Sequence, residues 1–122
     1  MDLYDKKYIE LLNIQIGCML KLHRLQQGLS QHQIAVAIDS TSTTIGRIER
    51  AEVVGGWDKI YMLSHTLKID YNQLFILLPL MKLLIIIDEI YSLEQKLNQE
   101  KEAYYKSLKE NLKIKYNAIL KR

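Results

Sequence analysis

Apolar side chains recur at helical spacing along most of this chain, three or four residues apart. The first such set consists of Ile9, Leu12, Ile16 and Leu20. This spacing predicts a helix that ends near Gln27, because Gly28 supplies a C-terminal stop. The pattern as a whole predicts an all-α protein.

Residues 28–50 predict two short helices joined by a tight turn. Ser30 is a good N-cap, and Gln33 three residues later completes a capping-box pattern. Residues 39–40 favour a turn, and Thr41 offers a second N-cap. The inward-facing positions are Leu29, Ile34, Ala35, Ile38, Ile45 and Ile48. Two helices joined so closely form a helix-turn-helix, whose second helix usually enters the DNA major groove.

Two more helical segments follow before the only proline of the chain. The first covers residues 57–66, and the second begins with Asp70 as its N-cap. Pro79 is costly inside a helix but suits a first turn. The boundary near Pro79 predicts one domain over residues 1–78 and a helical region over residues 79–122.

The C-terminal region carries a different pattern. A coiled-coil spacing of three and four residues connects Leu83, Ile86, Ile90, Leu93 and Leu97. The pattern stops over residues 98–102 and resumes in another phase. Its second set is Tyr104, Leu108, Leu112, Tyr116 and Ile119. Such a shift predicts either one long helix with a stutter or a turn between two antiparallel helices.

Residues 80–120 also predict self-association. Additional apolar positions, such as Leu84 and Ile85, widen the apolar surface, and contiguous exposed patches usually mark association surfaces. We expect a homo-oligomer, with a dimer favoured. The predicted interface residues are Leu83, Ile86, Ile90, Leu93, Leu97, Tyr104, Leu108 and Leu112. The alternative is a hairpin that packs back onto its own domain.

Composition restricts the class of protein. A chain of 122 residues with 48% apolar residues can bury one core. Cys18 is the single cysteine and cannot form an internal disulfide, which fits a reducing cytosol. The N-terminus does not read as a signal peptide, and the most apolar stretch, residues 74–87, is too short to span a bilayer. We therefore expect a cytoplasmic protein with no membrane partner.

The net charge of +3 is unevenly distributed. Residues 1–80 carry eight Lys/Arg and eight Asp/Glu, whereas residues 101–122 carry seven against two. Phosphate contacts dominate DNA affinity, so a DNA-binding domain normally carries a basic face. Residues 1–80 are formally neutral, so their composition does not indicate such a basic face.

The residues at 28–31, 34–35 and 42–50 resemble the Xre family of helix-turn-helix proteins. The similarity extends without a gap from about Ile16 to Phe75 and includes residues 57–63 and 67–75. It implies the five-helix, lambda-repressor-like fold of phage repressors and related bacterial regulators. It also implies a sequence-specific regulator of transcription, a dimeric repressor that reads an inverted repeat in double-stranded DNA.

The resemblance assigns the DNA contacts residue by residue. Base-reading positions correspond to Ser42, Thr43, Gly46 and Arg47, and an arginine reads guanine well through two acceptors. Gln31 corresponds to a phosphate-contacting position. Further backbone contacts correspond to His32, Thr41, Thr44 and Arg50. The alternative interpretation is an ordinary solvated polar face.

Two other family positions bear on the predicted interface. Arg24 corresponds to a residue that pairs with the glutamate of the second motif helix, here Glu49; the alternative is an exposed arginine. The loop at residues 51–56 departs from the family, because it lacks the usual glycine and basic residues and contains Glu52, Val53 and Val54. This departure removes phosphate contacts and favours a second hypothesis, a protein-interaction module such as an antitoxin, anti-repressor or assembly subunit.

No catalytic pattern is present in the sequence. The histidines and Cys18 lack metal-ligand spacing, and the chain has no glycine-rich phosphate loop and no nucleophile motif. We therefore expect no enzymatic activity, no metal and no cofactor.

Overall fold

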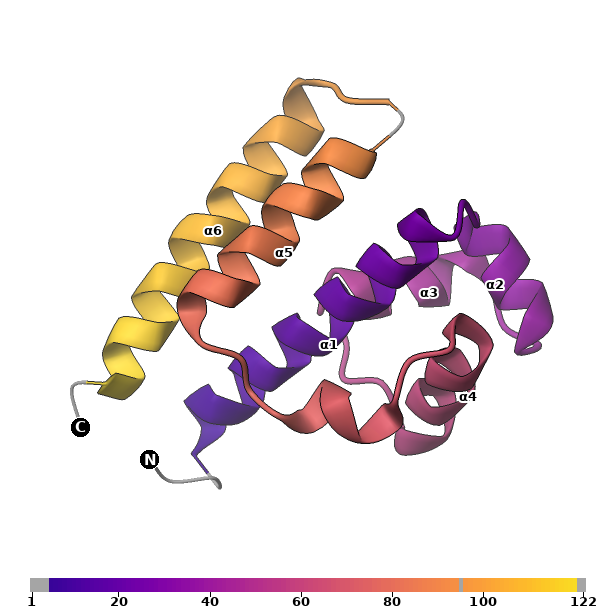
Figure 1. The fold of residues 1–122 in the computed structure, drawn as a ribbon, viewed down its shortest axis with the longest axis horizontal. Helices are drawn as coiled ribbons and strands as arrows, with labels where there is room; N and C mark the ends of the chain where they lie inside the picture. Colours follow the sequence, from indigo (N-terminus) through magenta and orange to yellow (C-terminus); the bar gives the residue numbers. More distant parts are fainter. Residues whose placement is uncertain (1–4, 95, 121–122) are drawn as a thin grey trace.

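The computed structural model describes residues 5–94 and 96–120, and in these residues all regular structure is helical (Figure 1). The elements are α1 (Lys6–Gln26), α2 (Gln31–Ala37), α3 (Ser42–Glu49), α4 (Trp57–Leu67), the 3-10 helix η1 (Tyr71–Phe75), α5 (Leu80–Leu93) and α6 (Gln99–Leu120). The all-α prediction is thus confirmed. Within the described residues, no helix combines the length and hydropathy needed to cross a membrane.

Helix α1 lies between two groups of helices and contributes to two hydrophobic cores (Figure 1). On one face it packs with α2, α3, α4 and η1, and its buried side chains there are Ile16 and Leu20. On the opposite face it packs with α5 and α6. The side chains of α1 on that face are Leu11, Ile14, Cys18 and Leu22. The bundle is therefore organised around a single shared helix.

Helices α1 to α4 end in the same local motif. In each, one residue with positive φ follows the helix: Gly28, Asp39, Ala51 and Lys68. After α3, for example, the Glu52 N–H donates to the Arg47 carbonyl at 2.9 Å and the Ala51 N–H donates to the Ile48 carbonyl at 3.1 Å. This pair of bonds defines the Schellman motif, which satisfies carbonyls that the helix leaves unpaired.

A glycine allows α1 and α3 to approach closely. A Cβ atom added to Gly17 would lie 2.5 Å from the Glu49 carbonyl oxygen and 2.6 Å from that of Ile48. Since both contacts are with backbone atoms, a larger residue would force the helices apart. This close contact places the C-terminal end of α3 directly against α1.

Of the two alternatives for the C-terminal region, the structure contains the hairpin. Helices α5 and α6 run antiparallel, side by side, and dock on α1 (Figure 1). The segment before α5 is fixed by the buried Gln15, which donates to the carbonyls of Leu74 and Ile76 and accepts from the Leu78 N–H at 2.8 Å. The Tyr116 hydroxyl also donates to the Leu78 carbonyl, at 2.6 Å. The hairpin is thus held to the rest of the chain at its base.

This packing corrects part of the predicted oligomer interface. Leu83, Ile90 and Leu112 are at most 1% exposed, because their partners are the apolar side chains of α1 in the same chain. The prediction that these three residues meet another copy is therefore wrong for this fold. Of the other predicted interface residues, Ile86, Tyr104 and Leu108 are partly buried against the same core, and Leu93 and Leu97 are exposed. Self-association stays a prediction.

Candidate nucleic-acid interface

Helix α3 has one buried and one exposed face. Ile45 and Ile48 lie in the core that α1 shares with α2 and α4. Ser42, Thr43 and Arg47 are exposed. Among the described residues, no hydrogen bond or ion pair engages the Arg47 side chain. The predicted base-reading side chains at these three positions therefore lie together on the outer surface.

The predicted caps of α2 and α3 are present. Ser30 accepts from the Gln33 N–H at 3.1 Å, while the Gln33 side chain accepts from the Ser30 N–H at 2.8 Å. Thr41 accepts from the Thr44 N–H at 3.2 Å, and the two threonine hydroxyls lie 3.0 Å apart. The hydroxyls of Thr41 and Thr44, both predicted to contact DNA, thus already have partners within the helix end.

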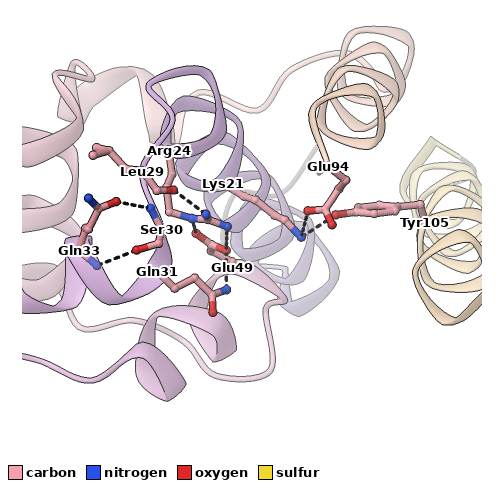
Figure 2. Close-up of polar contacts among 9 residues, drawn as sticks. All are labelled: Lys21, Arg24, Leu29, Ser30, Gln31, Gln33, Glu49, Glu94 and Tyr105. Atoms are coloured by element: carbon pink, nitrogen blue, oxygen red, sulfur yellow. Dashed lines mark hydrogen bonds and ion pairs between the residues drawn. The ribbon is translucent and has the colours of Figure 1, made fainter. Parts of the chain in front are cut away.

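The predicted ion pair between Arg24 and Glu49 is buried and bidentate (Figure 2). Arg24 donates from Nε to Glu49 Oε2 at 2.7 Å and from Nη2 to Oε1 at 3.0 Å. Its third donor, Nη1, reaches the Leu29 carbonyl at 2.9 Å. Because the side chains are only 8% and 3% exposed, the pair ties the end of α3 to α1.

Gln31 joins this network instead of standing free at the surface. Its Nε2 donates to Glu49 Oε1 at 3.0 Å, so one glutamate connects α1, α2 and α3 (Figure 2). The resemblance to the Xre family implies that the Gln31 amide meets a phosphate. In this structure the amide nitrogen is used to fix the start of α2, and the half-buried side chain still faces the groove in front of α2. His32 beside it is exposed.

Gly46 is covered by neighbouring side chains. It is buried, and a Cβ atom added to it would lie 2.9 Å from Arg50 Nη1 and 3.4 Å from Gln31 Nε2. These two side chains cover the glycine in this structure, and a close approach of Gly46 to DNA stays a prediction that requires them to move. Arg50 itself is exposed and pairs with Glu52 at 2.6 Å.

The loop after α3 forms an apolar edge beside the exposed face. Val54 and Trp57 are both 75% exposed, and Val53 is 40% exposed. The Asn13 side chain donates to the Val53 carbonyl at 3.3 Å, which anchors the loop to α1. Ala51 adopts φ 57° where the Xre pattern has glycine, so the turn is retained at the cost of some backbone strain.

The end of the hairpin lies near this site, which sequence reasoning missed. Lys21 of α1 points toward Glu94 and Tyr105 (Figure 2), with its Nζ 3.4 Å from the carboxylate and 2.5 Å from the hydroxyl. Lys101 contacts the other oxygen of Glu94 at 2.8 Å. Burial raises the pKa of Glu94, but the hydrogen bond from Lys101 and the charge of Lys21 outweigh it and hold this pKa below its usual value.

Cys18 and the histidines form no reactive centre in the described residues. Cys18 is buried in the core between α1 and the hairpin, and this burial raises the pKa of its thiol to about 12. The thiol therefore stays protonated near neutral pH. No group of three histidine, cysteine, aspartate or glutamate side chains in residues 5–94 and 96–120 is arranged to hold a metal ion.

Comparisons with family models, with curated proteins and with solved structures find no match for this chain.

Proposed function

We propose that this protein is a sequence-specific DNA-binding regulator of transcription in the cytoplasm. In this proposal, α2, the turn and α3 form a helix-turn-helix of the Xre type, and α3 enters the major groove. The protein binds as a dimer to an inverted repeat and represses transcription by blocking polymerase, the usual mode for proteins of that type.

The exposed trio of Ser42, Thr43 and Arg47 is the observation that carries the proposal. These side chains lie at the N-terminal end and on the outer face of α3, the positions from which recognition helices contact base edges. The buried Arg24–Glu49 pair supports the same interpretation, because it holds α3 rigidly while leaving Arg47 without an intramolecular partner. A base-reading side chain needs this combination of a fixed backbone and an unengaged donor.

Selection of bound duplexes from a random pool tests the proposal. We expect the full-length protein to enrich one motif, and Arg47→Ala to lose about 1–3 kcal/mol of discrimination at one base pair. Lys82→Ala is a matched control, since Lys82 is an exposed cation at the opposite end of the hairpin from its turn. Failure to enrich any motif, or an unchanged preference in Arg47→Ala, would contradict the proposal.

The apolar loop after α3 favours a second function, a protein-interaction module on the same scaffold. Val54 and Trp57 are strongly exposed, and Glu52 takes a position at which a basic residue would contact phosphate. An antitoxin, an anti-repressor or an assembly subunit would use this surface for a protein partner. A salt titration on random duplexes separates the two functions, because phosphate binding weakens steeply as salt rises. An absence of DNA binding at low salt would favour the protein partner.

A further inference from the structure

A groove of about 870 Å³ runs between the candidate interface and the turn of the hairpin. On the side of α2 and α3 its lining includes Gln31, His32 and Ser42, all of them predicted DNA contacts. On the side of the hairpin its lining includes Lys96, Lys101 and Tyr104. The groove therefore continues the candidate interface onto a part of the chain beyond the proposed helix-turn-helix.

Most of the charged side chains that line this groove are basic. Its lysines and arginines are Lys21, Arg24, Arg50, Lys96 and Lys101, against the carboxylates Glu94 and Glu100. Most of these cations are already paired: Arg24 with Glu49, Arg50 with Glu52, and both Lys21 and Lys101 with Glu94. Among the described residues, Lys96 is the exposed lysine of the groove that has no such partner.

Lys96 lies close in sequence to a network of paired charges that joins α1 to the hairpin. Glu94 is two residues before Lys96, its side chain is 7% exposed, and it is held by Lys21 from α1 and by Lys101 from α6. Lys21 also donates to Tyr105, which anchors the start of α6 (Figure 2). Within the part of the chain that the structure describes, Lys96 is thus an unpaired lysine that lines the same groove as this network and as Gln31 and His32 of α2.

We infer that Lys96 contacts a phosphate of the DNA strand that crosses the start of α2, so that the hairpin turn belongs to the DNA interface. This inference rests on the proposed function. It names the phosphodiester backbone as the ligand, because the lining of the groove has more cations than carboxylates and also offers the hydrogen-bonding side chains of Gln31, His32 and Ser42.

Salt titration of the full-length protein on a selected duplex and a random duplex tests the inference. A plot of log K against log salt concentration has a negative slope, and loss of one phosphate contact makes this slope less steep by about 0.9. We expect this change in Lys96→Gln, with affinity about threefold weaker for both duplexes and an unchanged ratio between them. Lys96→Glu is expected to weaken binding further, by about tenfold. Lys82→Gln is the control and retains the wild-type slope.

The outcomes separate the inference from the proposed function. A wild-type slope in Lys96→Gln, together with altered base preference in Arg47→Ala, overturns the inference and leaves the proposed function standing. A wild-type protein without salt-dependent DNA binding overturns both. Far-UV circular dichroism and the melting temperature are expected to stay unchanged in Lys96→Gln, because its side chain is exposed in a turn.

Discussion

The two sides of α1 are stabilised in different ways. On the side of α2, α3 and α4, short helices are defined by local interactions. Ser30 and Thr41 cap the starts of α2 and α3, and a Schellman motif closes each helix from α1 to α4. The partners in these motifs are at most five residues apart, so a short stretch of sequence specifies each turn.

On the hairpin side, the specifying contacts join distant parts of the chain. Helix α5 follows Pro79 without a side-chain cap. The hairpin is held by the apolar core with α1 and by bonds such as Tyr116 to Leu78 and Lys115 to Glu10, the latter spanning 105 residues. One side is therefore specified mainly by local chemistry, whereas the other depends mainly on contacts between distant parts of the chain, above all with α1.

The largest expected effect concerns the buried ion pair between Arg24 and Glu49, a long-range contact on the locally specified side. Glu49→Ala leaves the Arg24 guanidinium buried without its carboxylate, so we expect unfolding free energy to fall by about 3–5 kcal/mol. Glu52→Ala removes the exposed partner of Arg50 and is expected to cost less than about 1 kcal/mol. Urea unfolding measures both. Equal costs would mean that local caps, and not this ion pair, hold α3 in place.

The next effect tests whether the hairpin is part of the core. Leu112 is fully buried, whereas Ile114, two residues along the same helix, is 68% exposed. We expect Leu112→Ala to cost about 2–5 kcal/mol and Ile114→Ala less than about 0.5 kcal/mol.

Amide hydrogen exchange shows how far the damage of Leu112→Ala spreads. Because α1 joins both cores, protection is expected to fall in α3 as well as in α5. Loss of protection in α5 and α6 alone would show that the two sides unfold separately. The self-association predicted from the sequence would have to use side chains that this fold leaves exposed, such as Met81, Ile85 and Ile114. Sedimentation of Ile114→Ala against wild type therefore tests that prediction.

The smallest effect probes a single local motif. Ala51 adopts positive φ, so Ala51→Gly is expected to raise stability by about 1 kcal/mol through relief of backbone strain. Gly28 occupies the equivalent position after α1, and Gly28→Ala is expected to lower stability by a similar amount. Thermal unfolding of the two variants checks these opposite signs. A destabilised Ala51→Gly would show that the methyl group contributes packing that outweighs the strain.

Local signals made much of the first 75 residues predictable from sequence. Ser30 with Gln33, Thr41, and Gly28 mark helix ends through bonds to nearby backbone groups, and the structure contains each of them. The Arg24–Glu49 pair was predictable only through the family resemblance, since no local rule connects residues 25 positions apart.

The placement of the hairpin could not be predicted in the same way. A heptad-like spacing fits an interface between copies and a core within one chain equally well, so Leu83 and Leu112 carried no information about their partner. Burial of Gly46 also escaped prediction, because it depends on the rotamers of Arg50 and Gln31. The groove beside Lys96 forms only because the hairpin docks on α1, so it could not be predicted from the sequence either.

The buried side chain of Gln15 makes the length of the connection between η1 and α5 a fixed quantity. Its amide nitrogen donates to the carbonyls of Leu74 and Ile76, and its amide oxygen accepts from the N–H of Leu78. Inserting or deleting one residue there would leave a buried polar group unpaired, at about 1–3 kcal/mol. The length of this connection therefore constrains how the hairpin is rotated about α1. Through this constraint, Gln15 of α1 influences the position of the charged side chains at the far end of the hairpin.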